Sequence, residues 1–392
     1  MLTLTRRHFL KSAAALPFTG AAAQALARSA PAPRILVLLE LNGGNDGLNT
    51  VVPYADPLYA QQRPTLAVAR GEVLQLDERL GLHPALEPLM PSWHGGELAV
   101  ALGVGYARPN RSHFRSIEIW NSASTAEETL RDGWLHRVLV ENGAAETPPP
   151  GFEPQGIVLA GPEGPLAGDA LSPVVMRDPR QLAEAPRLLG SGATTAANPA
   201  LAHILATRAR TQGAAEEIGR RLHEAPAMTT VFPKSALGRQ LEIAAALIAA
   251  GAPASVIKLQ HSGYDTHAQQ KNRHGALLSE LALALSAFRQ AMIEWDAWQR
   301  VLVMTYAEFG RRVAENASGG TDHGSAAPHF LLGGRLRGGL YGAQPRLDDL
   351  EGGDLRPTLD FRRLYATVAG DWLGLPPAPA SLGRQSRLPL IA

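Results

Sequence analysis

Four apolar, β-branched runs divide the chain, and each of them ends in a polar or glycine-rich turn. The runs cover residues 34–41, 98–105, 255–259 and 301–306. A short continuous run of this kind is typical of a strand that is buried on both faces of a sheet. Residues 235–250 and 271–298 instead place apolar side chains at helical spacing, and Gly251 provides a stop signal for the first of them. The pattern predicts alternating strands and helices in the second half of the chain.

Acidic residues and histidines follow three of these runs. They are Asp46 after the first run, Asp265 and His267 after the third, and Glu308, Asp322 and His323 after the fourth. In an open α/β sheet, ligands and catalytic groups gather beyond the carboxyl ends of the strands. Asp and His offer the oxygen and imidazole nitrogen that divalent metals such as zinc or manganese accept. A turn-forming aspartate or a solvated loop explains any one motif, whereas three such strand ends together predict a metal centre.

A candidate nucleophile follows the run at 98–105. Arg111, Ser112 and His113 open a segment that we expect to be helical as far as about Trp120. Ser112 would lie near the helix start, where backbone N–H groups and the helix dipole stabilise an anion. A serine hydroxyl in that position can act as a nucleophile when a metal lowers its pKa. The alternative is that Ser112 only caps the helix.

Shorter patterns predict the remaining elements. Two of them indicate a helix at 134–140 and a strand at 156–159. We expect residues 121–233 to contain an insertion that shapes substrate access, and residues 340–341 to form a short edge hairpin. Residues 360–373 have an amphipathic pattern with Asp360 near its start, which predicts a helix that packs on the core.

The first 27 residues have the three parts of an export signal. Arg6 and Arg7 provide a basic start, residues 12–23 form a weakly apolar middle, and residues 25–27 provide small side chains before a cleavage site. Paired arginines followed by Phe-Leu-Lys resemble a twin-arginine signal, which a receptor reads as an address. The apolar middle is too short for a membrane span. We expect cleavage after Ala27, a periplasmic or secreted product and no stable membrane anchor; the alternative is a basic amphipathic helix of a cytoplasmic protein.

Composition excludes several classes of function. The chain has 392 residues, of which 45% are hydrophobic, and this is enough for one large α/β domain or two smaller ones. A formal net charge of +1, without a basic stripe, predicts no nucleic-acid partner. The sequence contains no cysteine, so disulfides, thiolate metal sites and a cysteine-derived formylglycine are all excluded.

Together, the motifs resemble a family of twin-arginine-exported proteins known as domain of unknown function 1501. The motifs that carry the resemblance are 41–49 (LNGGNDGLN), 111–114 (RSHF), 263–267 (GYDTH), 308–311 (EFGR), 320–324 (GTDHG) and 360–363 (DFRR). That family is in turn similar to the alkaline phosphatase and sulfatase superfamily. The resemblance implies an α/β three-layer sandwich in residues 28–392, a single domain with a mostly parallel, mixed central sheet, helices on both faces and a metal centre at the strand ends.

The resemblance also implies roles for individual residues. Asp46 matches the carboxylate that follows the first strand, and Ser112, with His113 beside it, is the best match for the nucleophile. The pairs Asp265 with His267 and Asp322 with His323 match later metal ligands, and either Glu308 or Asp322 matches a ligand at a strand end. The third histidine of a two-metal set stays open among His261, His274 and His329.

The leading hypothesis is therefore an exported hydrolase of phosphate or sulfate esters. One or two divalent ions (zinc, manganese or calcium) would activate Ser112, and Arg111 or Arg115 would bind the non-bridging oxygens. The expected partners are a small-molecule or polymer-linked ester and, during export, the twin-arginine translocase. The alternative is a non-catalytic binding or assembly protein with the same fold. Whether Arg311 and Arg312 reach the site stays open.

Overall fold

A computed structural model describes residues 33–143, 156–170, 173–176, 216–225, 227–252, 254–376 and 382–392, with single residues at 198, 201, 205 and 213. Within it, residues Arg34–Ala392 form one compact unit. The predicted export signal lies outside the described residues. Part of the insertion expected at 121–233 also lies outside them, so its effect on substrate access stays a prediction.

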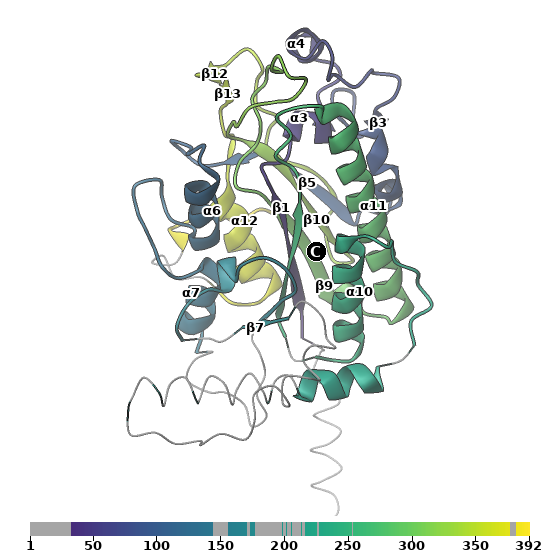
Figure 1. Cartoon of the computed structure of the whole chain (residues 1–392), viewed down its shortest axis with the longest axis vertical. Coiled ribbons are helices and arrows are strands. Elements are labelled where there is room, and N and C mark those ends of the chain that lie inside the picture. The colour runs from purple at the N-terminus through teal and green to yellow at the C-terminus, as the bar shows by residue number, and fades with distance from the viewer. Residues whose placement is uncertain are drawn as a thin grey trace, which may run out of the picture. The chain divides into compact units, whose positions relative to one another are not determined.

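A nine-stranded mixed sheet forms the centre of this unit (Figure 1). Its strand order is β11-β5-β10-β9-β1-β8-β6-β7, and β14 also pairs with β5. The strands are β1 (Ile35–Asn42), β5 (Leu98–Gly105), β6 (Gly156–Val158), β7 (Val174–Val175), β8 (Val256–Ser262), β9 (Val301–Tyr306), β10 (Ala327–Gly333), β11 (Gly339–Tyr341) and β14 (Leu359–Asp360).

The central strands confirm the predicted apolar runs. In β1 and β9 every residue except Asn42 is buried, as expected of strands with helices on both faces. β1 pairs in parallel with β8 and β9, so these three strands end at the same edge of the sheet. Among the described strands of this sheet, β10 alone runs antiparallel to its neighbours, β5 and β9. The sequence did not predict β10, whereas the mixed, mostly parallel character of the sheet is confirmed.

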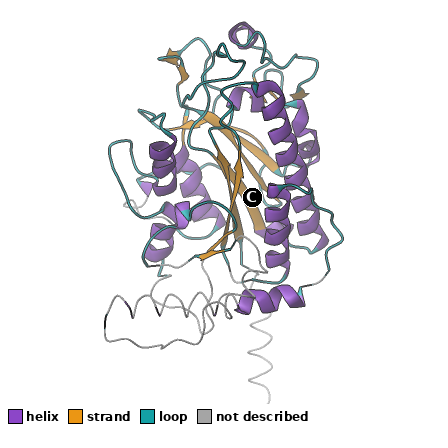
Figure 2. Cartoon of the chain, in the orientation of Figure 1, coloured by secondary structure: helices purple, strands orange, loops and turns teal. Residues whose placement is uncertain are grey.

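Helices cover both faces of the sheet, which confirms the predicted three layers (Figure 2). The α-helices are α3 (Gly47–Thr50), α4 (Pro57–Gln62), α5 (Met90–His94), α6 (His113–Ser122), α7 (Trp134–Glu141), α10 (Ala236–Ala249), α11 (Gln270–Glu294) and α12 (Phe361–Thr367). Alternate residues of β1 divide between two cores: Val37 and Leu39 pack with α10 and α11, and Leu36 and Leu38 pack on the side of α6, α7 and α12.

Shorter elements complete the unit. The 3₁₀ helices are η1 (Pro84–Leu89), η2 (Gly164–Leu166) and η3 (Trp298–Arg300), and η4 (Val368–Trp372) is a π-helical turn. The remaining strands are β2 (Val51–Val52), β3 (Leu74–Gln75) and β4 (Gly81–Leu82), in one small sheet, and β12 (Leu350–Glu351) and β13 (Asp354–Leu355), in another.

The two local predictions for the C-terminal part of the chain have different outcomes. The hairpin expected at 340–341 is wrong, because β11 pairs in parallel with β5, a strand far away in the sequence. The helix expected at 360–373 is confirmed as α12 followed by η4, and the Asp360 carboxylate caps it by accepting a hydrogen bond from the Arg362 N–H.

Among the described helices, α11 alone is long and apolar enough to cross a membrane by length and composition. The same test selects the core helices of globular proteins. Leu278, Leu281, Leu285 and Phe288 of α11 are fully buried in the core that it shares with α10 and β1. We therefore describe α11 as a core helix of this fold.

Candidate metal centre

Loops that follow β1, β8 and β9 meet at one edge of the sheet, and the buried side chain of Arg311 connects them. Its guanidinium donates to the carbonyl oxygens of Gly44 (2.6 Å) and Thr321 (2.9 Å) and to the Asp265 carboxylate (2.7 Å). It also donates to the carbonyl of Gly43. Arg311 is only 1% exposed. One permanent positive charge thus fixes the positions of three strand-end loops.

The glycines after β1 are required by close approach of these loops. Gly43 has a φ of 116°, and a Cβ atom there would lie 2.5 Å from the backbone nitrogen of Asp265. The N–H of Gly43 donates to Oε1 of Glu308 at 2.9 Å. A residue with a side chain at position 43 would therefore push the β8 loop away from the β1 loop.

The Asp265 carboxylate lies at the centre of three histidines. Its Oδ1 is 3.0 Å from Nε2 of His267 and 3.3 Å from Nε2 of His323. Its Oδ2 is 3.6 Å from Nε2 of His113, the first residue of α6. The Asp265 side chain is 47% exposed, so the cluster opens to solvent. These distances confirm that the β8 loop, the β9 loop and the start of α6 converge.

Each of these three rings holds its other nitrogen, Nδ1, against an oxygen acceptor. The pairs are His323 with the Arg111 carbonyl (2.9 Å), His113 with the Glu308 carboxylate (2.7 Å) and His267 with the Asp322 carboxylate (3.4 Å). Because a carbonyl or carboxylate oxygen only accepts, the proton of each neutral ring lies on Nδ1. All three Nε2 atoms therefore present lone pairs toward Asp265, which is how proteins orient histidine ligands of metals.

The donor atoms fit a divalent cation. Nε2 of His267 and Nε2 of His323 lie 2.9 Å apart, so their two lone pairs face each other unless a cation or a proton lies between them. Donor atoms of a tetrahedral site with metal–nitrogen bonds of about 2.0–2.1 Å lie about 3.3 Å apart, close to the separations seen here. Two imidazoles with one carboxylate suit zinc or manganese better than calcium, which prefers oxygen ligands.

Local charges tune the ionisable groups of the cluster. The hydrogen bond with Glu308 raises the pKa of His113, against the effect of burial. Burial lowers the pKa of His323 and keeps its ring neutral. Burial opposes ionisation of Asp265, but the hydrogen bond and charge of Arg311 outweigh it, so the pKa of Asp265 is lowered. The pKa of Asp322 is lowered mainly by the hydrogen bond from Asn316. Asp265 is consequently an anion at neutral pH, as a metal ligand requires.

The structure does not bring Asp46 into this cluster. Its carboxylate is fully buried and forms an ion pair with Arg63 at 2.6 Å, and it also accepts a hydrogen bond from the Gln270 amide. Burial alone would raise the pKa of Asp46, but the charge and hydrogen bond of Arg63, together with the charges of His274 and Arg311, outweigh it and lower the pKa. Asp46 is also the N-cap residue of α3. The carboxylate after the first strand therefore has a structural partner here, and the metal-ligand role expected from the resemblance stays a prediction.

Glu308 and Asp322, expected as direct ligands, instead contact Nδ1 atoms of the histidines. Glu308 is only 1% exposed, and within the described part of the chain its Oε2 has no hydrogen-bond partner. His113, which the sequence had placed only beside the nucleophile, contacts both Asp265 and Glu308. Its link to Glu308 spans 195 residues, so no local pattern reveals it.

The three histidines considered for that place are buried elsewhere. His261 contacts the Tyr264 hydroxyl at 2.9 Å, His274 contacts Asn45 at 2.8 Å, and His329 packs its ring edge-on against Trp120.

Ser112 occupies the N-cap position of α6, but its side chain makes no capping hydrogen bond. The side chain is exposed, next to His113 in the chain. Its backbone N–H donates to the side-chain oxygen of Asn110 at 2.8 Å, and its carbonyl accepts from the Ser116 N–H at 2.9 Å. The hydroxyl is thus open to solvent beside the cluster, and its predicted role as nucleophile stays a prediction.

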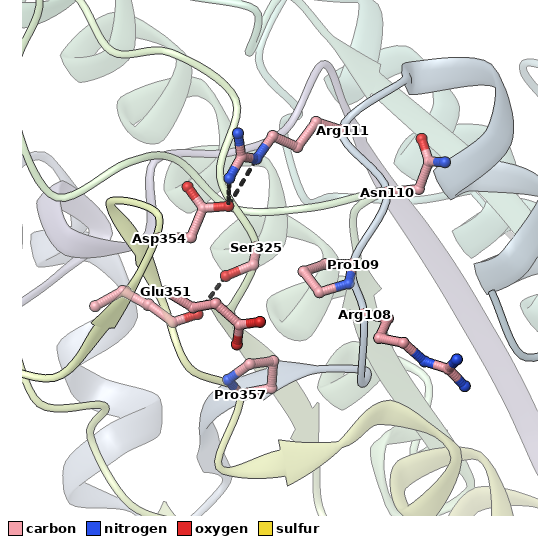
Figure 3. A pocket seen from close by; sticks show the side chains of 9 residues that line it. Arg108, Pro109, Asn110, Arg111, Ser325, Glu351, Asp354 and Pro357 are labelled. Atoms are coloured by element: carbon pink, nitrogen blue, oxygen red, sulfur yellow. Dashed lines mark hydrogen bonds and ion pairs between the residues drawn. The ribbon is translucent and has the colours of Figure 1, made fainter.

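The two arginines expected to bind substrate oxygens are engaged in other contacts. Arg111 donates from Nε and Nη2 to one oxygen of Asp354, both at 2.7 Å, and the two side chains point toward each other in Figure 3. Arg115 donates to the backbone carbonyls of Ala126 and Glu128. Arg311, whose position the sequence left open, contacts Asp265 instead.

Two cavities lie beside the cluster. One, of about 460 Å³, is lined by Arg108, Arg111, Asp354 and their neighbours (Figure 3). The other, of about 250 Å³, is lined by His113, Phe114, Glu308 and residues at the ends of β1 and β8. Arg111, which lines the first cavity, contacts His323 through its carbonyl oxygen, and His113 lines the second cavity.

Comparison with known proteins identifies a family. The profile of the family described as "Protein of unknown function (DUF1501)" matches residues 175–379, slightly more than half of the chain. No protein of curated function matches the sequence.

Solved structures with a similar chain path were also found, each with 10% sequence identity. A protein in the alkaline phosphatase superfamily from Vibrio parahaemolyticus has a TM-score of 0.42, over 90% of this chain and 69% of that one. BT1596, a 2-O GAG sulfatase, has a TM-score of 0.42 over 91% and 73%. The periplasmic domain of EcEptC from Escherichia coli has a TM-score of 0.40 over 92% and 89%.

Proposed function

We propose that this chain, which belongs to the DUF1501 family of proteins of unknown function, is an exported, metal-dependent hydrolase of phosphate or sulfate esters. One observation carries the proposal: three histidines direct Nε2 toward one ionised carboxylate, and each has its Nδ1 held by an oxygen acceptor. Buried-core histidines have no need for such an arrangement, whereas a metal centre depends on it.

Asp265, His267 and His323 would hold a divalent ion, with His113 on the other carboxylate oxygen of Asp265. When bound, such an ion polarises the ester and lowers the pKa of a neighbouring hydroxyl group. Arg311 keeps Asp265 ionised and fixes the loop that carries it. The Glu308 carboxylate holds the His113 ring in the tautomer that leaves Nε2 available.

Ser112 is the proposed nucleophile. Its oxygen would bond to the phosphorus or sulfur while the bond from that atom to the leaving alcohol oxygen breaks. The serine proton passes to solvent, and the leaving oxygen takes a proton from water. A second water then cleaves the serine ester and restores the hydroxyl. The N-terminus of α6, which starts one residue later, favours the negative charge that collects there.

Metal content and turnover test this function together. The mature protein, residues 28–392, is assayed with 4-nitrophenyl phosphate and 4-nitrophenyl sulfate in zinc, manganese and calcium, and bound metal is measured by elemental analysis. We expect Asp265→Asn and His323→Ala to lower metal affinity at least tenfold and to lose turnover in proportion. His94→Ala, which changes an exposed histidine on α5, is the matched control and should match the parent.

Other outcomes would contradict the proposed function or change its mechanism. Folded parent protein without bound divalent ion, or undiminished turnover in Asp265→Asn, contradicts it and favours the non-catalytic binding or assembly protein. Ser112→Ala separates two mechanisms: complete loss of turnover with metal retained supports the serine nucleophile, and retained turnover assigns that role to water.

The proposed function includes export. Residues 1–27 are the proposed twin-arginine signal, with the translocase as partner and cleavage after Ala27. Replacing both Arg6 and Arg7 by lysine should leave the full-length precursor in the cytoplasm. Fractionation and the mass of the mature N-terminus measure this, and unchanged export of the double variant would refute the assignment.

A further inference from the structure

A small cavity adjoins the metal centre on the Glu308 side of His113. Its volume is about 250 Å³, the size for one small ring, and it lies between the start of α6 and the carboxyl ends of β1 and β8. His113 and Glu308 line it together with Phe114, Asn121 and Gln260. His113 also lies 3.6 Å from Asp265, so the cavity and the candidate metal centre share this residue.

Glu308, which lines the cavity, has one buried carboxylate oxygen without a donor among the described residues. Oε1 of Glu308 accepts from the Gly43 N–H (2.9 Å) and from His113 Nδ1 (2.7 Å), whereas Oε2 has no partner among the described residues. Glu308 is 1% exposed, and proteins seldom leave a buried carboxylate oxygen unmatched. A ligand hydroxyl that donates to Oε2 would complete its hydrogen bonding.

Charge in the cavity is already balanced. Its second carboxylate, Glu40, forms an ion pair with Lys258 at 2.9 Å and accepts hydrogen bonds from Gln260 (3.0 Å) and the Tyr306 hydroxyl (3.2 Å). Arg311 and a divalent ion at Asp265 would offset the charge of Glu308 from the neighbouring site. A charged ligand, whether an anion or an ammonium group, would find no unpaired charge in this cavity. The cavity therefore favours a neutral ligand.

An exposed aromatic ring provides the apolar side of the cavity. Phe114 is 84% exposed, although large aromatic residues are usually buried. Ile117, one helical turn later on α6, and Pro162 line the same cavity. Apolar surface on one wall and amide or carboxylate groups on the other match a ring whose C–H faces are apolar and whose edges carry hydroxyl groups.

We propose that this cavity binds a neutral, hydroxyl-bearing ring of the hexose type, and that this ring is the alcohol part of the ester cleaved at the metal centre. The inference rests on the proposed function for its second half. Phe114 packs on the face of the ring, Glu308 accepts from one hydroxyl, and Asn121 and Gln260 bind others.

Binding and turnover are measured separately on the zinc-loaded mature protein. Glucose and galactose are titrated by ligand-observed NMR, with glucosamine as the charged comparison. We expect millimolar binding of at least one neutral sugar, weakened tenfold or more by Phe114→Ala and retained in Phe114→Tyr. Since Phe114 is exposed, both variants should fold like the parent. His94→Ala serves as the surface control.

Turnover of glucose 6-phosphate and glucose 6-sulfate is then compared with that of methyl phosphate, which is too small to fill the cavity. Phe114→Ala should raise KM for the sugar ester tenfold and leave KM for methyl phosphate unchanged. Turnover of aryl esters without sugar binding, an unaffected Phe114→Ala variant, or tighter binding of glucosamine overturns this inference and leaves the proposed function standing. Sugar binding without any ester turnover supports the ligand class and overturns the proposed function.

Discussion

Acid should lower the free energy of unfolding of this protein through its buried histidines. His329 should show the effect most clearly. It lies on β10 with 1% of its surface exposed, and neither ring nitrogen has a partner in the described part of the chain. Its ring packs edge-on against Trp120, with centroids 5.2 Å apart. Burial lowers the pKa of His329 to about 3. The folded state therefore excludes the imidazolium form over most of the acid range.

The sign and size follow from proton linkage. In the unfolded chain a histidine titrates near pH 6.5, so between about pH 6.5 and pH 3 the unfolded state binds the extra proton. Stability is then lost as the pH falls through this window. At pH 5 the solution is about 1.5 pH units below the pKa of the unfolded-state histidine. Each of these units lowers the free energy of unfolding by about 1.4 kcal/mol. His329 alone should therefore lower the free energy of unfolding by about 2 kcal/mol at pH 5.

The test substitution is His329→Phe, which keeps a ring against Trp120 and removes the two unmatched nitrogens. Free energies of unfolding are measured by urea denaturation at pH 7.5 and pH 5, and we expect the loss between them to be about 2 kcal/mol smaller in the variant. His94→Gln controls for the number of histidines. An equal loss in His329→Phe and the parent would refute the reasoning, because it would mean that His329 binds its proton equally in both states.

Three further outcomes follow from contacts near the candidate metal centre. Arg63→Leu leaves the fully buried Asp46 carboxylate unpaired, so the free energy of unfolding should fall by about 3–5 kcal/mol in denaturant titrations, with partial recovery when Asp46→Asn is added. Gly43→Ala places a methyl group 2.5 Å from the Asp265 nitrogen, so elemental analysis should show weaker metal binding even where the circular dichroism spectrum is unchanged. Zinc at a hundredfold excess over its Kd should add about 3 kcal/mol to the free energy of unfolding of the parent, and an equal gain in Asp265→Asn would speak against the site.

Much of the sheet could be predicted from the sequence. Strands β1, β5 and β9 have continuous apolar runs, and their observed bounds agree with the predicted ones to within a residue or two. The prediction missed β10, because Pro328 and His329 interrupt its pattern just after a glycine-rich loop. The pairing of β11 with β5 could not be predicted either, because pairing between distant strands is set by tertiary packing and not by the local sequence.

The site could be predicted in part. Asp265, His267 and His323 each follow a strand whose end is fixed by its apolar run, so their convergence follows from a parallel sheet. The ion pair of Asp46 with Arg63 was not predicted, because a carboxylate in a tight turn looks the same in sequence whether it meets a cation or an arginine. The contact of His113 with Glu308 depends on how the start of α6 packs against the loop that follows β9, which residue order does not encode locally.

The hydrogen bonds of Arg311 have a consequence for how such a family diversifies. Most of them go to main-chain oxygens, which every amino acid supplies, and only one goes to the side chain of a proposed ligand. A descendant could exchange Asp265 or the histidines for other residues and still keep the architecture of the rim. Loss of the proposed ligands would leave Arg311 and its contacts with the loops in place, so the arginine alone does not indicate whether the proposed metal site is intact.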